Sequence, residues 1–257
     1  NQISINIIKN MNSSKLDIEL LEKGYRLGDA VISDSAFKHL ENNLIRITPK
    51  YNYFNSLENP LPKLPKDNYK LFLNSLLKRT RLSIEPKISG TSIAIEYING
   101  KINKAITKDN IDITKKINQL INIPKVIPII KKLQVRGKLY EPNQKPLHSK
   151  ISTNTFLNKK NIFHPKLDFS CFQILNGRLN QYETLNYLKK CGFNTPNCYF
   201  TNFTSQVEFF RQEWLSGKLF TNYPTNGIVI KINSRKLQLL REKSDCSFKD
   251  WQYAIEN

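Results

Sequence analysis

A single lysine, Lys87, stands near the end of the alternating run IEPKI (residues 84–88) and is followed by the pair Ser89-Gly90. A second alternating run, TSIAIEY (residues 91–97), begins directly after this pair. Alternation of apolar and polar residues is typical of half-buried strands, so we expect a hairpin with its turn at Ser89-Gly90. The hairpin would place the amine of Lys87 at a strand terminus, where it could meet the phosphate of a nucleotide. The alternative is that Lys87 is a solvated surface charge beside a turn.

The net charge of the chain is +19, from 40 lysines and arginines against 21 aspartates and glutamates. This excess favours an anionic partner, such as a nucleotide or a nucleic acid backbone, because unbalanced charge costs self-repulsion. The competing explanation is a compositional bias toward Lys, Asn and Ile, as expected from A/T-rich coding DNA. Pairs of adjacent lysines are expected to be mostly solvated.

Cysteine spacing and hydropathy limit the possible classes of protein. The four cysteines show no C-x-x-C spacing and the three histidines complete no zinc signature, so we expect reduced thiols and a cytoplasmic location. No apolar run is long enough for a transmembrane helix, and the N-terminus lacks the apolar core of a signal peptide. Because the only methionine is Met11, we expect the sequence to be a segment of a longer chain.

The elements that must position Lys87 change character along the chain. Residues 1 to about 50 show helical spacing of apolar residues, and three prolines between residues 60 and 65 then indicate a linker. We expect helices at 67–78, 112–121, 181–190 and 204–216, and strands at 83–88, 92–97, 101–107, 133–140, 168–174 and 226–233. Asn99-Gly100 predicts a tight hairpin between the second and third strands. The pattern is α+β: a small helical N-terminal unit and a mostly antiparallel sheet domain with helices.

Short motifs, in order over nearly the whole chain, resemble those of the NAD-dependent DNA ligases. The run ISDSAFKHL (residues 32–40) is similar to the family's ISDAEYDxL, and EPKISG (residues 85–90) to its nucleotidyl-lysine motif ExKxDG. Further matches are NGK (99–101), TKD (107–109), DIT (112–114), VRGKLY (135–140), LDF (167–169), NGIVIK (226–231) and WQYAIE (251–256). A single short motif would be weak, so the resemblance rests on the ordered set.

The resemblance implies a ligase adenylation domain over residues 67–257, an α+β nucleotidyltransferase fold that is ATP-grasp-like and has antiparallel sheets. A small helical Ia-like domain with its linker would precede it at residues 1–66. The implied activity is transfer of AMP from NAD to Lys87, with Mg²⁺, as the first step of sealing nicked double-stranded DNA in replication and repair. An OB-fold or other ligase domains would follow residue 257, and no membrane is involved.

The resemblance also assigns nucleotide-binding residues, position by position. Lys87 keeps the place of the nucleophile, Lys231 that of a lysine contacting the α-phosphate, and Glu85 that of a carboxylate near the adenine. Without the resemblance, Lys231 would be an ordinary charge at the end of a strand. Three further positions are Gly90 and Arg136, which persist, and Lys108, which replaces an arginine and loses its bidentate fork. Arg136 could equally be a structural ion-pair residue.

Four positions depart from the family. Ser89 replaces the aspartate after the nucleophile, and Lys138 replaces the glutamate that would hold the ribose hydroxyl. Asn226 replaces the aspartate that heads the metal-associated motif, and Glu256 the last motif lysine. An ammonium cannot accept a hydrogen bond from ribose, and Asn226 could offer a metal only a neutral oxygen. We keep Ser89 and Lys138 as nucleotide-binding positions and Asn226 as the metal position, while Glu256 would repel phosphates.

On the nicotinamide side, the corresponding residues are Tyr25, Asp34, Phe37 and Lys38, of which Asp34 keeps the family's residue. A family loop that carries AAGSLR is shortened and rewritten here as residues 152–160.

Three functions are compatible with this set of residues. The first is a divergent adenylation module that still forms lysyl-AMP. The second is a catalytically degenerate ligase-like domain that binds nucleic acid or nucleotide without turnover. The third, an RNA ligase or capping-type enzyme that uses a nucleoside triphosphate, shares the lysine motif, but the Ia-like stretch speaks against it.

Overall fold

The computed structural model of the chain describes Leu57 and residues 64–66, 68–120, 122–129, 132–158, 167–175, 177–243 and 250–256. The chain divides into two compact units, residues 1–56 and 57–257, and all described residues belong to the second. The helices expected in residues 1 to about 50 lie outside the described residues, as do Tyr25, Asp34, Phe37 and Lys38. The domain boundary at residue 66 stays a prediction.

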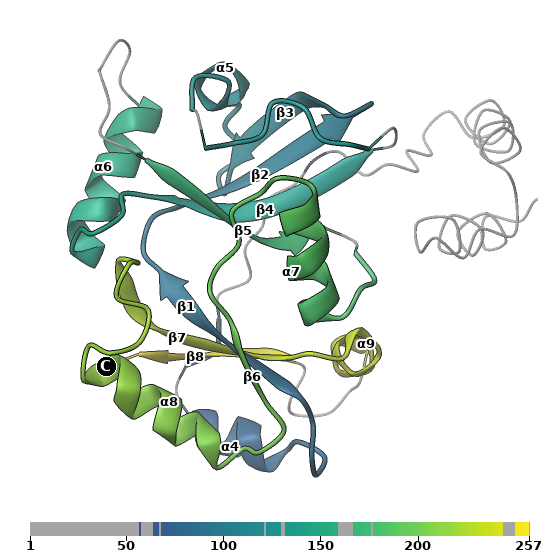
Figure 1. The fold of residues 1–257 in the computed structure, drawn as a ribbon, viewed down its shortest axis with the longest axis vertical. Helices are drawn as coiled ribbons and strands as arrows, with labels where there is room; N and C mark the ends of the chain where they lie inside the picture. Colours follow the sequence, from purple (N-terminus) through teal and green to yellow (C-terminus); the bar gives the residue numbers. More distant parts are fainter. Residues whose placement is uncertain are drawn as a thin grey trace, which may run out of the picture. The chain divides into compact units, whose positions relative to one another are not determined.

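Two antiparallel sheets form the framework of the second unit (Figure 1). The β1 sheet has the strand order β6 (Tyr199–Thr201), β1 (Leu82–Ile88), β7 (Thr225–Ile232) and β8 (Gln252–Glu256). The β2 sheet has the order β3 (Lys101–Thr107), β2 (Thr91–Ile98), β4 (Leu133–Tyr140) and β5 (Asp168–Ile174). The predicted α+β class with antiparallel sheets is therefore confirmed.

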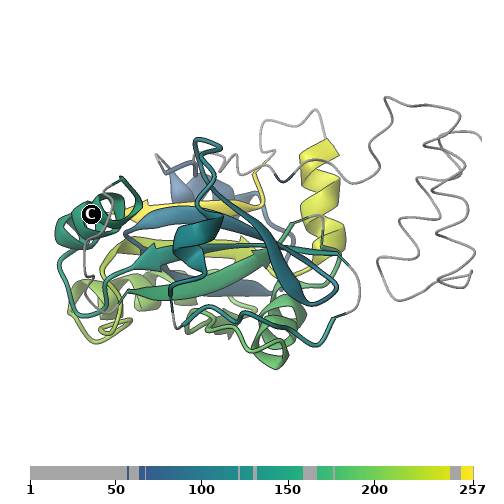
Figure 2. The same cartoon turned by 90° about the horizontal axis from the view of Figure 1, so that it is seen from above.

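Helices pack against both sheets (Figures 1 and 2). Those that pack on the β1 sheet are α4 (Tyr69–Asn74), α8 (Gln206–Leu215) and α9 (Arg235–Lys243). Those that pack on the β2 sheet are α5 (Thr114–Ile117), α6 (Pro146–Asn158) and α7 (Gln181–Lys190). None of the helices in the described ranges is both long and apolar enough to span a bilayer.

Each sheet has an apolar face because successive side chains of a strand point to opposite sides. Ile84 of β1 and Ile230 of β7 are fully buried in the core between the β1 sheet and its helices. Ile95 of β2 and Val135 of β4 are fully buried in the core of the β2 sheet. Full burial of one such side chain contributes about 1.5–3 kcal/mol. The polar residues between them must point the other way, and these polar faces meet at the site described below.

The hairpin predicted at Ser89-Gly90 is wrong. β1 pairs with β6 and β7, whereas β2 pairs with β3 and β4, so Ser89-Gly90 carries the chain from one sheet to the other. A Cβ atom at Gly90 would lie 2.1 Å from the carbonyl oxygen of Leu139, so glycine allows the chain to cross directly against β4. Period-two patterns locate strands but do not specify their partners. The alternation therefore predicted both strands correctly and their pairing with each other wrongly.

The hairpin predicted at Asn99-Gly100 is confirmed. It joins β2 to β3, with Ile98 opposite Lys101, and both turn residues have positive φ, 50° and 76°. Asn-Gly is the pair that adopts this conformation at least cost in two-residue turns.

Several elements differ from the expected pattern. The helices expected at 67–78 and 112–121 shorten to α4 and α5, and α6, α9, β6 and β8 were not predicted. Residues 152–158, expected as part of a loop, form the second half of α6. Its apolar residues are few and irregularly spaced, so its sequence carries little helical periodicity, although Thr153, Phe156 and Leu157 are buried.

Candidate functional site

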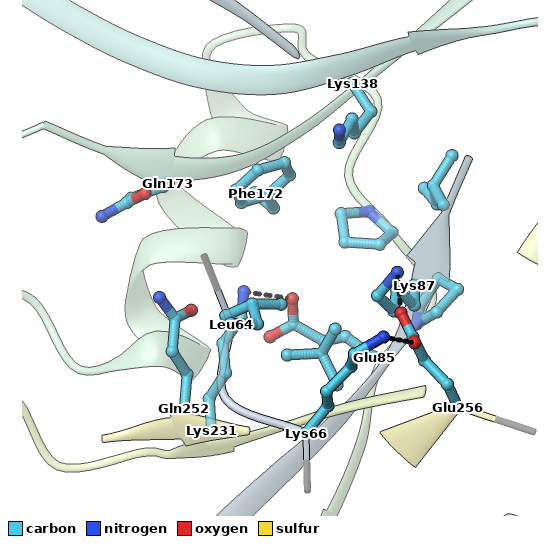
Figure 3. Close-up of a pocket in the computed structure, with 14 residues that line it drawn as sticks. Leu64, Lys66, Glu85, Lys87, Lys138, Phe172, Gln173, Lys231, Gln252 and Glu256 are labelled. Carbon is cyan, nitrogen blue, oxygen red and sulfur yellow. Dashed lines mark hydrogen bonds and ion pairs between the residues drawn. The ribbon is translucent and has the colours of Figure 1, made fainter. Parts of the chain in front are cut away.

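The polar faces of the two sheets line a cavity of about 290 Å³ (Figure 3). Glu85, Lys87 and Lys231 enter it from the β1 sheet, and Lys138 and Phe172 from the β2 sheet. Among the described residues, four lysines and two glutamates line the cavity; those not yet named are Lys66 and Glu256. The wall therefore carries an excess of positive charge among apolar side chains such as Ile88, Phe172 and Val229.

Lys87 lies at an irregularity in the pairing of β1 with β7. Pro86 pairs with Ile228 and Ile88 with Thr225, so two residues of β7, Asn226 and Gly227, face the single Lys87. Such bulges turn a side chain away from its regular direction. Gly227 leaves room for the lysine stem, because a Cβ atom there would lie 3.3 Å from Lys87 Cδ and 2.3 Å from the carbonyl oxygen of Ile255.

The amine of Lys87 is held by two oxygen atoms. Its Nζ lies 2.7 Å from Glu256 Oε1 and donates to Asn226 Oδ1 at 3.0 Å. The other oxygen of Glu256 accepts from Lys66 Nζ at 2.8 Å. These hydrogen bonds, first from Lys66 and then from Lys87, hold the pKa of Glu256 below its ordinary range. Glu256 thus bridges two lysines, and Lys87 must leave it before its nitrogen can attack any electrophile.

A buried ion pair lies deeper in the same cavity. Lys231 Nζ is 2.5 Å from Glu85 Oε2, and the two side chains are only 6% and 3% exposed. Ser83 Oγ and Gln181 Nε2 donate to the other carboxylate oxygen at 3.0 and 2.8 Å. Lys231 Nζ also lies 5.0 Å from the centre of the Phe172 ring. A buried carboxylate with three donors is fully satisfied, and this compensates its loss of hydration.

The opposite wall carries Lys138, which points from β4 into the cavity (Figure 3). Its one hydrogen bond among the described contacts is a long one, 3.4 Å from Nζ to the carbonyl oxygen of Gly90. Burial, followed by the nearby charges of Lys87, Lys108 and Lys150, lowers the pKa of Lys138 to about 8.

Other residues predicted for the site lie outside the cavity lining. The Ser89 hydroxyl donates to the carbonyl oxygen of Pro146 at 2.8 Å, and Gly90 packs on β4. Arg136 is buried and donates to Gln173 Oε1 at 3.1 Å, while Lys108 is exposed after β3. The predicted set is thus divided: Glu85, Lys87, Lys138 and Lys231 line the cavity, and these other four do not. Their roles in binding a nucleotide stay predictions.

The donor set does not fit a metal ion held by the protein. Within the described ranges, no three His, Cys, Asp or Glu side chains gather to hold one. The Oδ1 atom of Asn226, the predicted metal position, already accepts from Lys87. Mg²⁺ would have to arrive with phosphate oxygens of a substrate, as is usual for this ion.

Three residues of the site were not found from the sequence: Phe172, Gln181 and Lys66. Phe172 could have been found, because it alternates with Phe169 and Cys171 of β5, which face the core. Gln181 could not, because it begins a helix 96 positions after Glu85 and meets it only in the folded chain.

Comparisons with known proteins agree with the resemblance carried by the motifs. A family model described as the NAD-dependent DNA ligase adenylation domain matches residues 42–166. The DNA ligase of Petrotoga mobilis is 27% identical, with 88% of this chain and 43% of the relative covered. The DNA ligase of Mycoplasmopsis agalactiae is 26% identical, with 86% and 38% covered. The chain thus spans about two fifths of the length of these curated relatives.

One solved structure, described as "Pmar-Lig_Pre.", has a TM-score of 0.51 at 13% identity and covers 89% of this chain and 52% of that one. At this identity the likeness shows the fold alone.

Proposed function

We propose that this chain, which is similar to the NAD-dependent DNA ligases and is matched over residues 42–166 by a model of their adenylation domain, transfers AMP from NAD to Lys87. One observation carries the proposal. The Lys87 amine lies in the wall of a cavity that also holds the buried Glu85–Lys231 pair and has more lysines than carboxylates. Such a cavity suits the phosphates of a nucleotide, because fixed cations in a site of low polarity stabilise phosphoryl charge.

The proposed step forms one bond and breaks another. The Lys87 nitrogen, after losing a proton to water, attacks the α-phosphorus and forms an N–P bond. The P–O bond to nicotinamide mononucleotide breaks, and this group leaves with the bonding electron pair. Lys231 would face the phosphoryl oxygens once a phosphate competes with Glu85 for its ammonium group. The ring of Phe172 offers an apolar face on which a base could stack.

The remaining parts of the function are proposed on the same basis. The relatives are named DNA ligases, so we propose nicked double-stranded DNA as the acceptor of AMP, on a chain whose charge of +19 favours a polyanion. Tyr25, Asp34, Phe37 and Lys38 are proposed to hold the nicotinamide half of NAD. Reduced thiols in Cys171, Cys191 and Cys198 accord with a cytoplasmic location.

A second candidate function is nucleotide binding without turnover. The ion pair between Lys87 and Glu256 favours it, because the carboxylate binds the amine that should attack and would repel an incoming phosphate. The lysine that the family resemblance predicts at position 256 would neither bind the amine of Lys87 nor repel a phosphate.

Mass spectrometry of the intact protein separates the two candidates. The folded chain is incubated with NAD and Mg²⁺, in parallel with ATP and Mg²⁺, and Lys87→Ala serves as the control. A gain of one AMP from NAD alone, absent in the control, is the result expected. No adduct from either nucleotide, in a sample that circular dichroism shows to be folded, would refute turnover, and nucleotide binding measured by calorimetry would then establish the second candidate.

A further inference from the structure

We propose that Lys138 makes the cavity selective for adenine nucleotides that carry a phosphate group in addition to the one next to Lys87. The inference rests on the proposed function, because it takes the cavity to be a nucleotide site. It concerns a residue whose chemistry is opposite to that of the glutamate expected at its position, so it does not follow from the family resemblance.

The first argument is the direction in which Lys138 points. Its neighbours Val135 and Leu139 lie in the core of the β2 sheet, so the alternation of β4 turns Lys138 toward the cavity. There its Nζ has one described hydrogen bond, at 3.4 Å to a backbone oxygen. An ammonium group has three donors, and most of that capacity is available to a ligand in the cavity.

The second argument is the charge around Lys138. Among the described residues, the charged groups that act on it are lysines: Lys87 of β1, Lys108 after β3 and Lys150 of α6. Both carboxylates that line the cavity already bind lysines, Glu85 through Lys231 and Glu256 through Lys66 and Lys87. Lys138 therefore lies in a cationic region whose counter-charge has to come from the ligand.

The third argument is the chemistry of the possible partner. A ribose hydroxyl donates a hydrogen bond to a carboxylate, but toward an ammonium it is only a weak acceptor. A phosphate oxygen carries charge and makes a shorter and stronger hydrogen bond with an ammonium. The additional phosphate could be a ribose 2′- or 3′-phosphate or the second phosphate of a 5′-diphosphate, and both sources present the same dianionic group.

Calorimetric titration of the full chain near pH 7, without Mg²⁺, tests the inference with four probes: AMP, ADP, 2′,5′-ADP and 3′,5′-ADP. At least one probe with two phosphates should bind about tenfold or more tightly than AMP, since hydrogen bonds to charged groups contribute this much. A gain with ADP identifies the 5′-diphosphate as the source, and a gain with either of the others identifies the ribose phosphate.

The variants Lys138→Met and Lys138→Glu connect the gain to this side chain. Methionine keeps the apolar stem without the charge, so the gain should fall to within about threefold of AMP, and with glutamate it should vanish or reverse. Lys190→Glu, at an exposed position of α7, changes the net charge by the same amount as Lys138→Glu. It should leave the tighter binding of the two-phosphate probe unchanged. AMP bound as tightly as all three probes, or a gain that survives in folded Lys138→Met, overturns the inference alone. If none of the four probes binds, the cavity is not a nucleotide site, and the proposed function fails and the inference with it.

Discussion

Removal of the charge of Glu256 should accelerate transfer of AMP to Lys87. The variant Glu256→Gln keeps the size of the side chain and its position on β8, but it no longer holds Lys87 through an ion pair. Lys87 keeps its hydrogen bond to Asn226 at 3.0 Å, so the amine stays near its present position. What changes is the interaction that the amine must leave before it attacks.

The size of the effect follows from the exposure of the pair. Both side chains are about a quarter exposed, 23% for Lys87 and 25% for Glu256. Ion pairs near the surface are worth about 0.2–1 kcal/mol, which corresponds to about a 1.4- to 5-fold change in the fraction of Lys87 released. Loss of a negative charge beside the transferring phosphoryl group acts in the same direction. We therefore expect a rise in rate of about three- to tenfold.

The assay is single-turnover adenylation with saturating NAD, followed by intact mass. Lys66→Met is the matched control: it removes the other partner of Glu256, which then binds only Lys87, so the rate should stay the same or fall. A rate in folded Glu256→Gln equal to or below that of the native chain would refute this account of the ion pair.

Three further predictions concern stability. Glu85→Ala leaves Lys231 buried without its carboxylate and should lower the free energy of unfolding by about 3–5 kcal/mol in urea titrations; a loss under about 1 kcal/mol would contradict a tightly coupled pair. Glu96 of β2 is buried, which raises its pKa, but hydrogen bonds from Lys132, Gln134 and Asn103 outweigh the burial, so its pKa, like that of Glu256, is lowered in the folded chain. The stability that these two groups contribute is therefore present above their ordinary pKa and is lost as pH falls through their folded values. The urea midpoint should therefore decline below about pH 4.5, and Glu96→Gln should decline less. Gly90→Ala places a Cβ atom 2.1 Å from a backbone oxygen of β4 and should cost about 1–3 kcal/mol, whereas an unchanged melting temperature would show that the crossing between the sheets can move.

The sequence predicted most of the strands and part of the site, for different reasons. Strand positions came from local alternation, and the turn at Asn99-Gly100 from a pair that suits positive φ. Glu85, Lys87 and Lys231 were grouped by resemblance to a family, and the structure brings them to one cavity.

What the sequence did not predict depends on contacts between distant segments. The separation of β1 and β2 into different sheets is decided by their partners, since Glu85 pairs with Val229 of a strand near the other end of the chain. The bridge from Glu256 to Lys66 and Lys87 joins three separate segments of the chain, and no spacing along the sequence predicts it. Periodicity is a property of a single strand, whereas the site depends on how several strands pair with one another.

The burial of Glu85 and Lys231 has a consequence for how this chain can evolve. Loss of either residue alone leaves an uncompensated charge in the interior, so selection for a folded protein preserves both, whether or not a nucleotide is still turned over. Lys87 is under no comparable constraint, because its side chain is partly exposed and its partners are accessible to water. In a lineage that had abandoned catalysis, Lys87 would drift first and the buried pair would remain. Among related chains, a lysine retained at position 87 therefore indicates selection for catalysis more reliably than retention of the buried pair does.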